Sequence, residues 1–138
     1  MTRLQTLLLA VCLSTLACSG SPTEITGGAQ IFEGTIAFGE TNMESLSITS
    51  AGGVRIEVLS VTADPELEAG FTPSLGFGLG EPDDEGECAL TFSTIISNNV
   101  QPLSIGLLAR DYCLTFFDNL TLAEDGTRTY SVSVAPSS

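Results

Sequence analysis

Apolar and polar residues alternate along most of the chain after residue 30. The alternation is regular over Phe32–Phe38, Val54–Val58 and Leu75–Leu79, where a hydrophobic side chain returns at nearly every second position. This period of two is typical of strands with one buried face, and it recurs about seven or eight times with Gly-, Asn- and Pro-marked turns between the repeats. The pattern predicts an all-β sandwich or barrel. The positions expected to face the core are Phe32, Ile36, Phe38, Leu46, Ile48, Val54, Ile56, Val58, Leu75, Phe77, Leu79, Leu90, Phe92, Tyr112, Leu114, Phe116, Tyr130, Val132 and Val134.

The first seventeen residues follow a different pattern. Arg3 carries the one charge of Met1–Ala17, and the run from Leu4 to Ala17 is mostly apolar. A charged start, a short apolar run and a small residue at its end are typical of an export signal. As a helix the run would rise about 21 Å, which is short of a hydrocarbon core of roughly 30 Å. The segment therefore predicts export rather than a permanent membrane span.

The end of this run, Ser14-Thr15-Leu16-Ala17-Cys18, resembles the bacterial lipobox. The resemblance implies that residues 1–17 are a lipoprotein signal peptide and that Cys18 is acylated and becomes the new N-terminus. It also implies a lipid-anchored protein of the bacterial cell envelope, with Ser19 favouring the outer membrane over the inner membrane. The alternative is an ordinary secretory signal with an incidental cysteine.

A small, polar, Gly-rich stretch follows, with the sequence SGSPTEITGGAQ over residues 19–30. It has too few apolar residues to build a core, so residues 18–30 are predicted to be a lipidated flexible tether. The folded domain is then expected over residues 31–138.

Two cysteines, Cys88 and Cys113, remain once residues 1–17 are removed and Cys18 is acylated. In an exported domain such a pair is expected to form a structural disulfide. A redox or metal-binding pair is the alternative, but the chain has no His and the two cysteines lack the Cys-x-x-Cys spacing.

The segments Ala109–Asp118 and Thr127–Val134 resemble the end of bacterial pre-peptidase C-terminal (PPC-like) domains. Upstream, Phe32-Glu-Gly-Thr35, Leu75-Gly-Phe-Gly-Leu79 and Cys88 occupy the places of that family's opening strand, glycine-rich strand and first cysteine. The resemblance implies a jelly-roll-like antiparallel β-sandwich of about eight strands, here as a stand-alone lipoprotein. Members of the family accompany secreted peptidases, and some bind matrix or polysaccharide.

The charge balance excludes several classes of function. With 17 acidic and 4 basic residues the formal net charge is −13, which argues against nucleic-acid binding. Without His, catalysis by Ser-His-Asp or Cys-His sites is excluded. We therefore expect a protein that is not an enzyme.

One short segment, residues 81–87, concentrates five carboxylates, and Asp64–Glu68 is a second acidic stretch. Oxygen ligands at this density suit Ca²⁺, although such a segment also serves as a solvated loop. The candidate calcium ligands are Glu81, Asp83, Asp84, Glu85 and Glu87.

Two aromatic residues, Phe71 and Phe117, fall outside the inward-facing pattern and are expected to form an exposed binding surface. The function expected from the sequence is a non-catalytic, membrane-anchored, extracytoplasmic binding module for a protein or polysaccharide partner. The alternatives are a calcium-stabilised structural or adhesion protein of the cell envelope and an accessory subunit of a secreted hydrolase.

Overall fold

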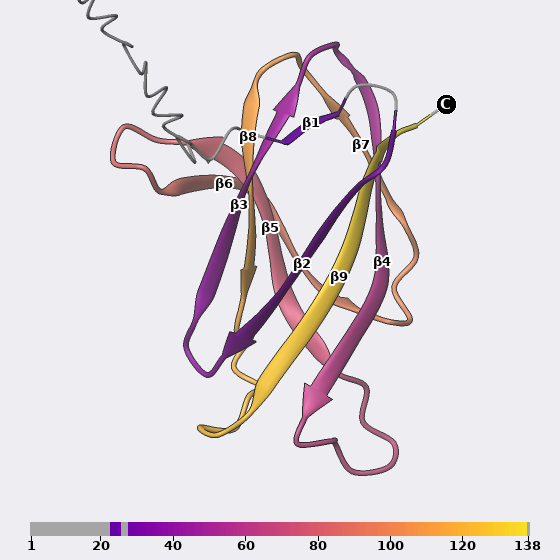
Figure 1. Cartoon of the computed structure of the whole chain (residues 1–138), viewed down its shortest axis with the longest axis vertical. Coiled ribbons are helices and arrows are strands. Elements are labelled where there is room, and N and C mark those ends of the chain that lie inside the picture. The colour runs from indigo at the N-terminus through magenta and orange to yellow at the C-terminus, as the bar shows by residue number, and fades with distance from the viewer. Residues whose placement is uncertain (1–22, 26–27, 138) are drawn as a thin grey trace, which may run out of the picture.

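The computed structural model describes residues 23–25 and 28–137. The predicted signal peptide, Cys18 and most of the predicted tether lie outside the described residues. Nine strands and no helix occur in the described part of the chain (Figure 1). The strands are β1 (Thr23–Ile25), β2 (Gln30–Ala37), β3 (Thr41–Ile48), β4 (Gly52–Asp64), β5 (Ser74–Pro82), β6 (Cys88–Ser97), β7 (Leu103–Leu107), β8 (Asp111–Phe117) and β9 (Thr127–Pro136).

Eight of the strands form two antiparallel sheets of four. One sheet has the order β2-β9-β4-β7, and the other has the order β3-β8-β5-β6 with β1 added at its edge. Chain segments that follow one another therefore alternate between the two sheets for much of the chain, which is the connectivity of an eight-stranded jelly roll. This confirms the all-β, jelly-roll-like sandwich expected from the sequence.

The short strand β1 lies inside the stretch that the sequence predicts to be a flexible tether. It pairs in parallel with Leu46, Ser47 and Ile48 at the end of β3. Strand addition at a sheet edge uses backbone N–H and C=O groups, which nearly every residue offers regardless of side-chain composition. A search for apolar periodicity therefore does not detect such a strand.

The alternating pattern correctly predicts most of the core. In β8, for example, Tyr112, Leu114 and Phe116 are all buried and face the opposite sheet. Rings from both sheets meet at the centre: Phe116 stacks on Tyr130 of β9 with centroids 3.9 Å apart and also contacts Phe77 of β5 at 5.5 Å. This aromatic column joins the two layers.

Two residues expected in the core, Phe38 and Leu90, are exposed instead, by 51% and 45%. Phe38 follows the last residue of β2 and precedes Gly39 with φ of 72°, so the strand alternation has already ended there. Leu90 adjoins a bulge at which Leu79 pairs with Phe92 while Gly80 pairs with Leu90. The extra residue in β6 moves Leu90 to the outer face of the sheet.

The disulfide between Cys88 and Cys113 is present, as the sequence predicted, with Cα atoms 5.8 Å apart. It joins the first residue of β6 to β8, across the intervening strand β5. Gly80 of β5 makes this crossing possible, because a Cβ at that position would collide with the carbonyl oxygen of Ala89. The missing side chain of Gly80 thus lets the backbone of its neighbour β6 approach β5 closely at the bulge.

The buried hydroxyl of Tyr130 predicts a loss of stability at alkaline pH. Burial, with a smaller contribution from Glu44, raises the pKa of this phenol above 10.0, and a hydrogen bond from Asn42 Nδ2 opposes the shift. A raised pKa stabilises the fold fully below about pH 10, and this contribution is lost as pH rises through the folded-state value. We expect the free energy of unfolding to fall above pH 10 more steeply in the native chain than in Tyr130→Phe. Denaturant unfolding at several pH values tests this, and an equal decline above pH 10 in the native chain and in Tyr130→Phe would contradict it.

Candidate functional site

The acidic segment predicted to bind calcium forms the β5–β6 hairpin. Asp83 uses its carboxylate to hold the turn, accepting hydrogen bonds from the backbone N–H groups of Glu85 and Glu87 at 2.9 and 2.8 Å. Glu81 lies on β5 and forms an ion pair with Arg110. Asp84, Glu85 and Glu87 are exposed.

The structure does not gather these carboxylates around a common point. Within residues 23–25 and 28–137 there is no group of three or more Asp, Glu or Cys side chains placed to hold a metal ion. A Ca²⁺ site needs six to eight oxygen ligands, and Asp83 already accepts two hydrogen bonds of the turn through one carboxylate oxygen. The geometry is that of a solvated hairpin loop.

This geometry predicts that calcium leaves the stability unchanged. We expect a few millimolar Ca²⁺ to shift the melting temperature by less than about 1 °C, because only a ligand that binds the folded state raises it. Thermal melts with calcium and with chelator measure this. A rise of several degrees that chelator removes would instead establish the calcium-stabilised alternative.

Phe117 lies on the outer face of the sheet that contains β3, β8, β5 and β6. Its ring is half-buried because it covers Gly76 of β5, where a Cβ would collide with the ring. Together with Thr115 and Leu90 it lines a shallow pocket of about 350 Å³. Phe117 is thus part of the outer sheet surface, and it lines a different pocket from those beside Phe71.

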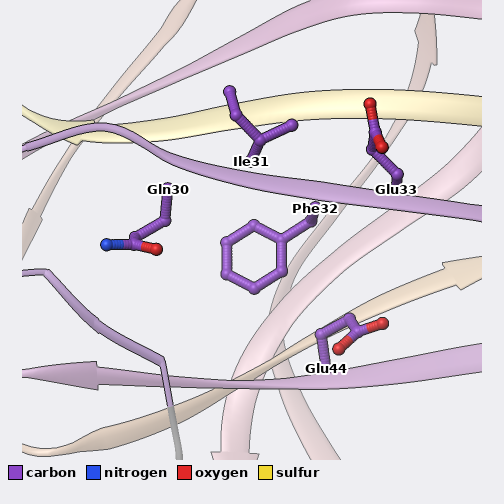
Figure 2. A pocket seen from close by; sticks show the side chains of 5 residues that line it. All are labelled: Gln30, Ile31, Phe32, Glu33 and Glu44. Atoms are coloured by element: carbon purple, nitrogen blue, oxygen red, sulfur yellow. The ribbon is translucent and has the colours of Figure 1, made fainter.

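A second pocket, of about 610 Å³, opens between the edge of β2 and β3 (Figure 2). Figure 2 shows the ring of Phe32 between the two strands, with Glu44 of β3 facing it and Glu33 on the other side of β2. The carboxylate of Glu33 accepts a hydrogen bond from Ser131 Oγ. The acidic lining and the buried ring give this opening few groups with which to hold a ligand.

Exposed apolar side chains gather at one end of the sandwich. We call it the loop end and define it as residues 38–40, 65–73 and 118–126, which connect β2 to β3, β4 to β5 and β8 to β9. These three connections meet at the lower end in Figure 1, and Gly39 N–H donates to the Asp118 carboxylate across two of them. Ten large apolar residues of the described chain are exposed, and four of them belong to the loop end. These four are Phe38, Leu67, Phe71 and Leu120.

Phe71 is the most prominent aromatic side chain of the loop end, with 70% of its surface exposed. It closes a turn in which its N–H donates to the Glu68 carbonyl, and Gly70 adopts the φ of 96° that the turn requires. The sequence prediction that Phe71 is exposed is confirmed.

Two adjoining pockets flank Phe71, and Leu67 lines both of them. The first, of about 320 Å³, is bounded by Asn98, whose side-chain amide exchanges two hydrogen bonds with the backbone of Val61. The Asn98 amide thus supplies the hydrogen bonds that a neighbouring strand would make to the unpaired edge of β4.

The other pocket beside Phe71, of about 380 Å³, has Arg128 of β9 in its lining. Arg128 is only 3% exposed, although arginine is rarely so buried without a partner. Sequence reasoning did not select it. The strand pattern could have predicted its burial, because Arg128 has the same parity as the inward-facing Tyr130 and Val132.

No helix of the described residues is both long and apolar enough to cross a membrane. Comparison with protein-family models and with curated proteins finds no match to this chain.

Proposed function

We propose that this chain is a non-catalytic binding module of the bacterial cell envelope, anchored through Cys18, and that it presents the loop end to a partner. One observation carries the proposal: an aromatic side chain, Phe71, stands 70% exposed between two pockets on a face where three loops converge. Exposed apolar surface of this kind marks interaction sites on soluble domains. The partner is a protein or a polysaccharide of the envelope.

The absence of catalysis is proposed from the available reactive groups. A catalytic carboxyl group needs burial or a charged neighbour to bring its pKa into the working range. The described carboxylates line exposed loops and strand surfaces, and Glu81, which pairs with Arg110, is itself 42% exposed. The chain also has no His, the side chain that most often serves as a general acid or base.

The placement of the loop end supports anchoring at the opposite side. Strand β1 pairs with the Ile48 end of β3, whereas Thr41 at the other end of β3 pairs with Phe117, which leads into the loop end. Figure 1 shows β1 and the β5–β6 hairpin at one end of the sandwich and the loop end at the other.

A tether attached before β1 therefore leaves the loop end facing away from the membrane. The acidic β5–β6 hairpin would face anionic lipid headgroups, and like-charge repulsion would hold the domain off the bilayer. Under this proposal the acidic charge acts as a spacer and the apolar loop end as the contact surface.

Site-specific photo-cross-linking in the producing cells tests the proposal. A photoreactive residue replaces Phe71 in one variant and Leu108 in the other. Leu108 is comparably apolar and 57% exposed, and it lies in the β7–β8 connection, which is bonded to the Ile48 end of β3 away from the loop end. We expect a discrete adduct from position 71 and none from position 108. Adducts from both positions, or from neither, would refute the loop end as the binding surface.

The anchor is tested in the same cells by the Cys18→Ser variant. We expect the native chain in the membrane fraction and the variant in the soluble fraction, because acyl chains supply the membrane affinity. A variant that stays in the membrane fraction would contradict anchoring at Cys18.

A second candidate is an accessory subunit of a secreted hydrolase. The observation that favours it is the jelly-roll strand order, which agrees with the fold implied by the resemblance to PPC-like domains. The two candidates differ in the identity of the adduct from position 71: a hydrolase supports the second candidate, and any other envelope component supports the first.

A further inference from the structure

We propose that the pocket between Phe71 and Arg128 binds the carboxylate of a small ligand with an apolar body. This inference rests on the proposed function, since it assigns a ligand class to one of the pockets of the loop end. The ligand is a monocarboxylate, either a free apolar acid or the C-terminus of an apolar peptide.

The first support is the burial of Arg128 without an anion. Its Nη1 donates to the Thr127 carbonyl at 3.2 Å, while its Nε is buried and has no hydrogen-bond partner. The ion pairs of the described residues are Arg55 with Glu57 and Arg110 with Glu81, so Arg128 forms none. A buried charge that lacks a counter-charge destabilises a fold strongly, and a bound anion would relieve that cost.

The second support is a preformed wall. Asn119 of the β8–β9 loop donates to Ser74 Oγ at 3.1 Å, and its side-chain carbonyl accepts a hydrogen bond from Thr121 Oγ1 at 2.6 Å. Both hydroxyl-bearing residues line the pocket with Arg128. The polar side of the pocket is therefore held in place before a ligand arrives, which lowers the entropic cost of binding.

The third support is the apolar part of the pocket lining, which matches the apolar body of the ligand. Leu67 and Phe71 provide apolar contacts, and the volume of about 380 Å³ lies in the range of small-molecule sites. A guanidinium offers parallel N–H donors that match a carboxylate. Together these groups suit an anionic head on an apolar body.

The net charge of the chain favours one negative charge over two. The protein carries a formal charge of −13, and Glu68 also lines the pocket. A phosphate dianion would meet about twice the repulsion of a monocarboxylate from these groups. Glu68 is the acidic residue of this lining, so its substitution tests how negative charge in the pocket affects binding.

Calorimetric titration of the full chain carrying Cys18→Ser tests the inference without lipid partitioning. The probes are 3-phenylpropionate and its neutral amide, together with an apolar tetrapeptide that has either a free or an amidated C-terminus. We expect each carboxylate to bind at least about tenfold more tightly than its amide. Binding of 3-phenylpropionate alone identifies a free acid as the ligand class, and binding of the free peptide alone identifies a C-terminus. Equal binding of acid and amide, or no binding of either acid, would overturn the inference.

Two variants separate ligand binding from a structural role of Arg128. Arg128→Met is expected to weaken carboxylate binding at least about tenfold while it leaves the melting temperature equal or higher, because it removes an unpaired buried charge. Glu68→Gln is expected to tighten binding about two- to fivefold by removing a like charge. If Arg128→Met does not fold, Glu68→Gln remains decisive: unchanged or weaker carboxylate binding in that variant refutes the site.

The outcomes also separate this inference from the function it rests on. Titrations without binding, together with a discrete adduct from position 71, would refute the carboxylate site and leave the loop end as the contact surface. Loss of that adduct would refute the proposed function itself.

Discussion

Replacing Phe116 by alanine is expected to lower the free energy of unfolding by about 3–5 kcal/mol. Phe116 has no exposed surface, stacks on Tyr130 at 3.9 Å and contacts Phe77 at 5.5 Å. Truncation would leave a cavity between the two sheets and remove both ring contacts. Because domains of this size are stable by only about 5–15 kcal/mol, the variant is expected to be marginally folded at 37 °C.

The neighbouring residue provides the matched control. Phe117 has the same side chain but the opposite parity in β8, where it is half-buried over Gly76. Phe117→Ala is expected to cost about 1–2 kcal/mol, since only part of the ring surface is removed from water. Equal losses in the two variants, measured by denaturant unfolding, would mean that the register of β8 is shifted by one residue.

Removing the disulfide with Cys88→Ala and Cys113→Ala is expected to cost about 3.5 kcal/mol by the chain-entropy account of a closed loop. The bridge joins residues separated by 25 positions, so it restricts the unfolded chain considerably. For a domain of this size the melting temperature should fall by roughly 15 °C.

Reductant serves as the control for this prediction. It should lower the melting temperature of the native chain by about the same amount and leave the double variant unchanged. A native chain that melts at one temperature with and without reductant would show that the bridge does not contribute to stability.

The strand alternation predicts the fold class well because the two faces of each strand meet different surroundings. In β9, Tyr130, Val132 and Val134 are buried and the residues between them are not, as a period of two predicts. The pairing of strands is less local. The alternation does not show that β2 lies beside β9 or that β4 lies between β9 and β7, because those contacts depend on connections across the whole chain.

The misplaced core residue Leu90 has a local cause that the alternation does not contain. A bulge beside Leu79 and Gly80 changes the parity of β6, and it turns Leu90 outward. The bulge depends on the close approach of the Ala89 backbone to Gly80. Glycine at position 80 permits this crossing, but the glycines at 76 and 78 follow the same spacing and accommodate side chains instead.

The candidate site is predicted only in part. The exposure of Phe71 is predicted correctly because this residue lies outside the alternation, next to Gly70. Arg128 is missed because a charged residue in an alternating strand is ordinarily assigned to the solvent face. The fold determines its burial: the loops before β5 and β9, which are far apart in the sequence, both contribute to the pocket around it.

Hydrogen exchange tests most directly the central claim that the loop end is the contact surface. The amide exchange of the lipid-anchored protein in its own membranes is compared with that of the purified protein. We expect slower exchange in the membranes at residues 65–73 and 118–126, with the β5–β6 hairpin unchanged. Slower exchange confined to that hairpin or to the outer face around Phe117 would contradict the account.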